Sequence, residues 1–167
     1  MGIITVFILT ILLTILLIPF ISVRWKGIVT VTAVVVLSVI SSIMAVEAMS
    51  GIRIEYLFRG SLVTKEIPIR VDALSGFFIL VINFTFLTGA FYGLQYMKAY
   101  RNQKANLSLH CISFILVQAS LIGICSLQNS IAFLIAWETM ALSSFMLIIF
   151  EHNKRDTINA GINFLIQ

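Results

Sequence analysis

Long runs of residues without a charged side chain dominate this sequence. Residues 2–23, 27–46 and 73–97 contain no charge, and residues 105–150 form a stretch of 46 residues with one charge. A helix that crosses a bilayer needs about 20 consecutive, mostly apolar residues. These runs therefore predict several membrane-spanning helices.

The overall composition excludes the main soluble classes. Only 11% of the 167 residues are charged and 60% are apolar, whereas about 25% of a typical soluble domain is charged. This excludes a soluble enzyme, a disordered chain and a nucleic-acid-binding domain. The net charge of +4 does not indicate nucleic acid, because the basic residues form short clusters between apolar runs, as in multi-pass membrane proteins.

We expect an all-α integral membrane protein with one membrane domain over residues 1–167. Its predicted spans are 3–23, 27–47, 73–97, 107–127 and 130–150, with an incomplete sixth at 157–167. The first run lacks a basic start and a small-residue cleavage site, which favours a retained helix over a signal peptide. The incomplete sixth span predicts either a short segment docked on a partner or the N-terminal fragment of a larger subunit.

The basic residues also predict an orientation. Connections 24–26, 98–106 and 151–156 together hold seven Lys or Arg residues, whereas the long connection 48–72 holds four, balanced by acids. Short loops rich in Lys and Arg lie on the cytoplasmic side. We therefore expect the N-terminus outside and the long connection on the outer surface.

The outer connection has a strand-like pattern. Residues 52–56 alternate between apolar and charged residues, and so do residues 67–72; a period of two is typical of β-strands. We expect a short β-hairpin with its turn near 59–61 and Pro68 on an edge. The alternative is an irregular solvated loop.

Glu138 is the single charge in the run 105–150 and falls near the middle of the fifth span. An ionised carboxylate there costs about 2.5 kcal/mol or more, and such a residue is by default a hypothesis of function. A carboxyl group that can hold a proton, or pair with a Lys on another helix, suits a proton-loading site. The alternative is that Glu138 only joins helices by hydrogen bonding.

The fifth span also has a face of small residues, which allows close packing on a neighbouring helix. This leaves Glu138 facing a second interface or a hydrated gap. The small face consists of Ala132, Ala136, Thr139 and Ser143.

Other polar residues are candidates for a polar pathway. Gln118 lies in the fourth span, and Asn159 and Asn163 are one turn apart in the incomplete sixth; the alternative is interhelical hydrogen bonding. His110, at the cytoplasmic mouth of the fourth span, suits proton entry or a simple interfacial position. Asp72, directly before the third span, is predicted to cap that helix. None of the complete predicted spans contains Lys or Arg.

No metal or cofactor is predicted. Cys111 and Cys125 fall in one predicted helix, about 21 Å apart along its axis, which is too far for a disulfide. The sequence has no Cys-x-x-Cys, and its two histidines are isolated.

Three stretches together resemble a known family. They are Trp137-Glu138 followed by Met-Ala-Leu-Ser-Ser-Phe at 140–145, the sequence from Phe150 to Ile166, and Ile-Arg-Val-Asp-Ala-Leu-Ser-Gly-Phe-Phe at 69–78. They resemble the antiporter-like, proton-conducting membrane subunits of the complex I superfamily. The resemblance is closest to the large membrane subunit of the hydrogenase-4 and formate hydrogenlyase type, and multi-subunit cation/proton antiporters share this fold.

The resemblance implies a subunit of about fourteen spans, of which this chain would be the N-terminal part. Glu138 matches a family Glu that pairs with a Lys on the seventh span, beyond residue 167. The implied localisation is the bacterial cytoplasmic membrane, with an outside N-terminus.

The implied function is proton translocation in a respiratory or energy-converting hydrogenase complex, in a subunit without catalytic residues or redox chemistry of its own. Its partners would be other membrane subunits, the lipid bilayer and, indirectly, a peripheral redox arm. One alternative is a subunit of a multi-subunit sodium/proton antiporter. Another is a truncated scaffold that transports nothing. Neighbouring genes would separate the first two.

Overall fold

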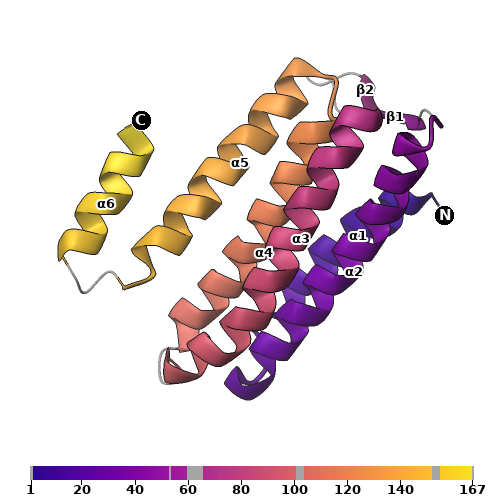
Figure 1. Ribbon diagram of the computed structural model, residues 1–167. Coiled ribbons are helices and arrows are strands. Elements are labelled where there is room, and N and C mark those ends of the chain that lie inside the picture. The colour runs from indigo at the N-terminus through magenta and orange to yellow at the C-terminus, as the bar shows by residue number, and fades with distance from the viewer. Residues whose placement is uncertain (1, 53, 60–65, 101–103, 152–154, 167) are drawn as a thin grey trace.

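The computed structural model describes residues 2–52, 54–59, 66–100, 104–151 and 155–166, and most of them are helical (Figure 1). This confirms a mainly helical fold with a two-stranded sheet. The helices are α1 (Ile3–Leu17), α2 (Val23–Met49), α3 (Ala73–Tyr96), α4 (Lys104–Ser126), α5 (Ser130–Ile148) and α6 (Arg155–Ile166). Short 3-10 helices, η1 (Met97–Tyr100) and η2 (Ile149–Glu151), follow α3 and α5, and the strands are β1 (Ile54–Arg59) and β2 (Glu66–Val71).

Within the described residues, four helices are long and apolar enough to cross a membrane: α2, α3, α5 and Asn106–Ser126 of α4. The first predicted span, 3–23, is shorter than expected, so five complete spans are not confirmed. Helix α1 has 15 residues and is about 22 Å long, against a hydrocarbon core of about 30 Å. Its C-cap is Ile18, directly before Pro19. Proline has no backbone N–H, so Pro19 cannot donate the hydrogen bond that would continue the helix.

Helix α2 begins four residues earlier than the predicted start at residue 27. As a result, Arg24 and Lys26 belong to the first turns of a helix and do not form a connection. This change affects the site described below, because it moves a basic side chain into the helix bundle.

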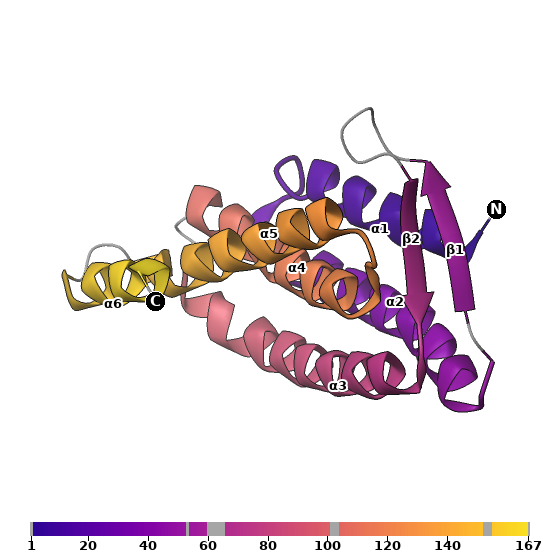
Figure 2. The ribbon, with the colours of Figure 1, turned by 90° about the horizontal axis from the view of Figure 1, so that it is seen from above.

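Helices α2, α3 and α4 form the centre of the bundle, with α1 against α2 and α4, and α5 against α4 (Figures 1 and 2). Helix α6 lies beside α5, outside this bundle. One apolar cluster includes Val34, Leu37 and Ile115. A second, nearer the hairpin, includes Val71 and Ile79.

Helices α2 and α3 approach closely at Gly76. A Cβ built on this glycine would lie 2.7 Å from the carbonyl oxygen of Ala45. Only a residue without a side chain allows the two backbones to come this near.

The predicted hairpin is present and lies across one end of the bundle (Figure 2). Its antiparallel register runs from Ile54 opposite Val71 to Arg59 opposite Glu66. The carbonyl oxygen of Pro68 accepts a hydrogen bond from the backbone N–H of Gln128 at 3.0 Å. The hairpin is thereby fixed to the α4–α5 connection. Most of the predicted turn lies outside the described residues.

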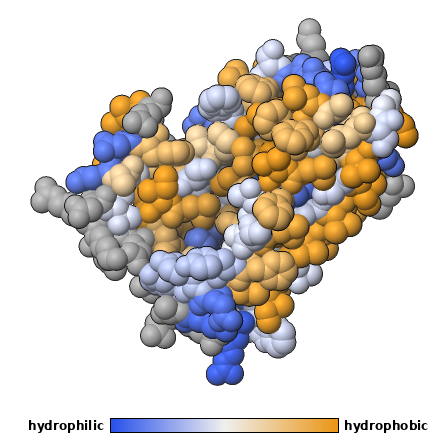
Figure 3. All heavy atoms as spheres, in the orientation of Figure 1, coloured by the Kyte–Doolittle hydropathy of each residue, from blue (hydrophilic) through white to orange (hydrophobic). Residues whose placement is uncertain are grey.

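The helix surfaces carry many large apolar side chains, while hydrophilic residues gather toward the ends of the bundle (Figure 3). Leu16 of α1, Phe84 of α3 and Leu134 of α5 are 69%, 71% and 63% exposed. Apolar surface of this extent is a membrane or partner surface. The chain is a multi-pass membrane protein.

Candidate functional site

Glu138 occupies the middle of α5, which has 19 residues. Its side chain is exposed, whereas the small residues Ala132 and Ser143 are buried. A Cβ added at Gly123 of α4 would lie 3.7 Å from the Cβ of Ala136. The small-residue face of α5 therefore packs on α4, and the carboxylate of Glu138 faces away from it.

Helix α6 contacts the same side of α5 that carries Glu138. Phe145 follows Glu138 by seven residues, which places both on one face of α5. Gly161 of α6 is buried there, and a Cβ on it would lie 3.0 Å from Cε2 of Phe145. Glu138 lies about 10 Å before Phe145 along the axis of α5. No hydrogen bond or ion pair joins Glu138 to another described residue.

Gln118 is fully buried in α4 and takes part in a hydrogen-bonded cluster with α2 and α3. Its Nε2 donates to Oγ of Ser38 at 2.9 Å. Asn83 Nδ2 donates to Oγ of Ser41 at 2.8 Å and of Ser42 at 2.9 Å, and to the carbonyl oxygen of Ser38 at 3.2 Å. We call these five residues the central polar cluster. It joins the three inner helices.

One acceptor in the central polar cluster is unsatisfied. Oε1 of Gln118 is buried and has no hydrogen-bond partner among the described residues. A buried amide oxygen without a partner is costly, so a water molecule is the simplest group that would satisfy it.

The other predicted pathway residues lie apart from the central polar cluster. Asn159 and Asn163 are exposed on α6, and Glu138 faces away from α4. Among the described residues, no hydrogen bond connects Gln118, Asn159 or Asn163 with Glu138. A continuous pathway through these residues stays a prediction.

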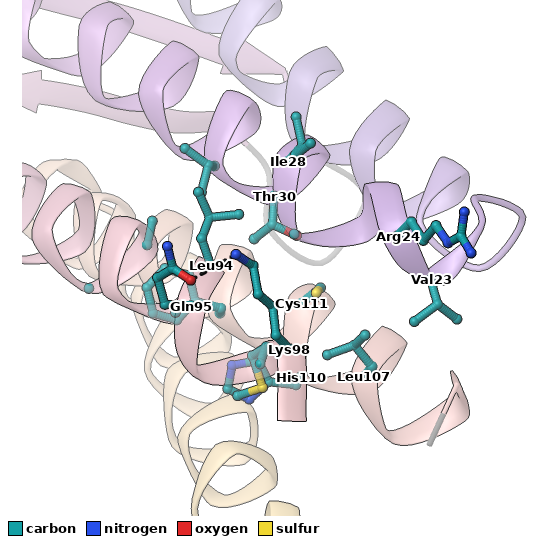
Figure 4. A pocket seen from close by; sticks show the side chains of 17 residues that line it. Val23, Arg24, Ile28, Thr30, Leu94, Gln95, Lys98, Leu107, His110 and Cys111 are labelled. Atoms are coloured by element: carbon teal, nitrogen blue, oxygen red, sulfur yellow. Dashed lines mark hydrogen bonds between the residues drawn. The ribbon is translucent and has the colours of Figure 1, made fainter. Parts of the chain in front are cut away.

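His110 is partly buried near the start of the spanning part of α4. Its ring packs edge-on against Phe150, with ring centres 5.1 Å apart, and near Phe114 at 6.4 Å. Its Nδ1 is buried without a hydrogen-bond partner among the described residues. His110 also lines a cavity between α2, α3 and α4 (Figure 4).

Lys26 is a buried basic residue that sequence reasoning placed in a connection. It is 3% exposed, and its Nζ donates a hydrogen bond to Oγ of Ser108 in α4. Lysine is almost never fully buried without a partner. A sequence signal was available: Lys26 precedes Thr30, Ala33 and Leu37 at helical spacing, and all of these are buried.

Asp72 is the N-cap of α3. Its Oδ1 accepts a hydrogen bond from the backbone N–H of Ser75 at 2.9 Å. Hydrogen bonds from the backbone and side chain of Ser75 lower the pKa of the Asp72 carboxyl below its ordinary value. Asp72 thus sets where the third predicted span begins.

No family model matches the chain. Individual proteins do match: antiporter subunit mnhA2 of Staphylococcus saprophyticus is 32% identical over 97 residues, and hydrogenase-4 component B of Escherichia coli is 31% identical over 97 residues. Antiporter subunit mnhA2 of Staphylococcus aureus strain JH9 is 34% identical over 92 residues.

The first two matches cover 58% of this chain but only 12% and 14% of the relatives, so the chain corresponds to a small part of their length. Both kinds of relative are membrane subunits of the complex I superfamily. Over more than half of its length, the chain is therefore similar to antiporter subunits and to hydrogenase-4 component B, as the motifs around Glu138 indicated.

Proposed function

We propose that this chain forms part of a proton-translocating membrane subunit and that Glu138 carries the proton. The observation that supports this most is the position of Glu138. It lies in the middle of a spanning helix and turns away from α4, on the face that α6 contacts. A carboxylate left against lipid at this depth costs about 2.5 kcal/mol or more, so a further helix or a hydrated path must cover it.

The proposed role follows from the chemistry of a carboxyl group in this position. Glu138 releases its proton when a cationic side chain on a further helix approaches, and takes one up when that cation withdraws. Lys26 is not this cation, because it is buried between α2 and α4, whereas Glu138 is exposed on the side of α5 that faces away from α4. The partner would therefore belong to a segment beyond this chain.

We propose that the whole subunit is longer, with about fourteen spans, and that this chain is its N-terminal part. The small share of each relative that the chain matches supports this. The partners would be other membrane subunits of the same complex. A peripheral redox arm would drive the movement of protons in a respiratory or hydrogenase complex.

The second candidate is a subunit of a multi-subunit sodium/proton antiporter. It is favoured by the similarity to antiporter subunits of two staphylococcal species. The geometry of Glu138 suits both functions, because both require a carboxyl group that exchanges its proton within the membrane. The two differ in what drives the exchange.

Inverted membrane vesicles distinguish these functions. Vesicles from cells with the intact complex, from a deletion strain and from the complemented strain would be compared with a fluorescent pH-gradient dye. Redox-driven proton translocation predicts that an electron donor acidifies the vesicle interior. This acidification should be lost on deletion of the gene and restored by complementation. The antiporter predicts that Na⁺ dissipates a preformed gradient only when the gene is present. If deletion changes neither response, the chain is a non-transporting scaffold.

A further inference from the structure

A cavity of about 300 Å³ lies between α2, α3 and α4 (Figure 4). It is situated where α2 begins and α3 ends, since its lining extends from Val23 and Arg24 to Met97 and Lys98. Its volume is at the lower end of the range for ligand pockets, about 300–1,000 Å³. The cavity belongs to the inner bundle and not to the face that carries Glu138.

Small residues on facing helices create this space. Gly27 of α2 and Gly89, Ala90 and Gly93 of α3 all line it. A Cβ added at Gly93 would meet no atom within 4 Å, so the space beside this glycine is open. The other walls are largely apolar and suit a hydrocarbon chain; they include Val23, Ile28, Val31, Leu94, Leu107 and Phe114.

The polar groups of the cavity are mainly cationic or neutral donors. Arg24 comes from α2 and Lys98 from η1, and no carboxylate belongs to the described lining. Figure 4 shows Lys98 reaching toward Gln95, whose Oε1 accepts a hydrogen bond from Nζ of Lys98 at 2.7 Å. An ammonium group has three donors, so this bond leaves Lys98 able to bind an anion. The unpartnered Nδ1 of His110 is a further polar atom at this cavity.

We propose that this cavity binds an anionic phospholipid. One acyl chain would occupy the open space beside Gly93, and the phosphate would lie against Lys98, with Arg24 as a second, separate cation at the same end of the cavity (Figure 4). Both cations stand at helix ends, where lipid headgroups lie, and basic pockets between spanning helices are known to suit anionic headgroups. The proposal does not depend on the role of Glu138.

Photolabelling of the intact complex tests this site. The purified complex would be reconstituted with phosphatidylglycerol, phosphatidylcholine or a free fatty acid, each with the same photoreactive acyl chain, and labelled peptides would be identified by mass spectrometry. We expect phosphatidylglycerol to label the α2, α3 and α4 segments that line the cavity roughly tenfold more than phosphatidylcholine, given two near-surface cations. Equal labelling by the two phospholipids, or strongest labelling by the fatty acid, would overturn the proposal.

Two sets of variants separate the headgroup site from the acyl site. The double variant Arg24→Gln/Lys98→Gln should reduce labelling by phosphatidylglycerol to the level of phosphatidylcholine. Gly93→Leu should fill the open space and remove labelling by both lipids. Thr85→Leu places the same side chain on an exposed position of α3 and should leave labelling unchanged. Retained labelling in assembled Gly93→Leu contradicts the site; if that variant does not assemble, the charge variant decides.

Discussion

Asp72 stabilises the start of α3 through hydrogen bonds that its ionised carboxylate accepts. The bonds from Ser75 lower its pKa below the ordinary value of 3.8. Because the folded pKa is below the unfolded one, this stabilisation is complete above about pH 4 and is lost as pH falls through the lowered value.

Asp72→Asn is the matched variant, since asparagine also caps helices but does not titrate. We expect the melting temperature of the detergent-solubilised complex to fall less steeply below pH 4 for Asp72→Asn than for the parent protein. Asp72→Ala should be less stable than both at neutral pH. Identical acid profiles for the parent and Asp72→Asn would contradict the role of the charge.

Variants of the central polar cluster test whether Gln118 has a role beyond joining the helices. Ser38→Ala would leave Nε2 of Gln118 buried without its acceptor, which costs about 1–3 kcal/mol. Gln118→Leu removes both the hydrogen bond and the unpartnered Oε1, so it should destabilise the protein less than Ser38→Ala does. Thermal unfolding of both variants measures this, with exposed Thr85→Ala as the control. A larger effect of Gln118→Leu would show that Oε1 has a partner, as a pathway through water requires.

At the level of helices, close contacts at glycines hold α3 in place. At Gly76, a methyl group would collide with the backbone of Ala45, whereas at Gly93 it would meet open space. We expect Gly76→Ala to destabilise the complex by about 1–3 kcal/mol, as overpacking does, while Gly93→Ala should be neutral or stabilising because alanine favours helix. Thermal unfolding in detergent would compare the two; equal stability of both variants would contradict the close approach of α2 and α3.

The helices and the hairpin could be predicted because their signals are local. The uncharged runs predict the helices, the alternation in 67–72 predicts a strand, and the carboxylate of Asp72 predicts a helix cap. Each of these signals comes from residues that are close together in the sequence. Two features were missed. Helix α1 ends before Pro19 although the apolar run continues to residue 23. A hydropathy pattern does not predict this end, because it carries no information on how proline restricts the backbone. The helical spacing of Lys26 with buried residues was overlooked, and its partner Ser108 lies 82 residues away, a contact that only the tertiary structure reveals.

At the level of the whole molecule, the distribution of basic residues predicts the orientation. The end with Arg24 and Lys98 should face the cytoplasm, and the hairpin should face outside. Single cysteines at Lys98 and at exposed Glu66, in a background with Cys111 and Cys125 replaced by serine, would be labelled in intact cells with an impermeant maleimide. We expect labelling at position 66 and protection at position 98. Labelling at position 98 without labelling at position 66 would show that the orientation is the opposite of the predicted one.

The proposed function depends most on one carboxyl group, and one measurement tests it most directly. Proton translocation would be measured in vesicles with assembled Glu138→Gln, Glu138→Asp and, as a control, Glu47→Gln, which changes an exposed acid near the end of α2. Assembly of each complex would be checked on a native gel.

Glutamine keeps the size and much of the hydrogen-bonding capacity of the glutamate side chain but cannot release a proton. We therefore expect Glu138→Gln to abolish or strongly reduce proton movement, Glu138→Asp to retain part of it and Glu47→Gln to retain all of it. Neutral hydrogen bonds between spanning helices contribute only about 0.6 kcal/mol on average, so a purely structural Glu138 would tolerate glutamine. Full proton movement by assembled Glu138→Gln would contradict the account and leave Glu138 as a packing residue.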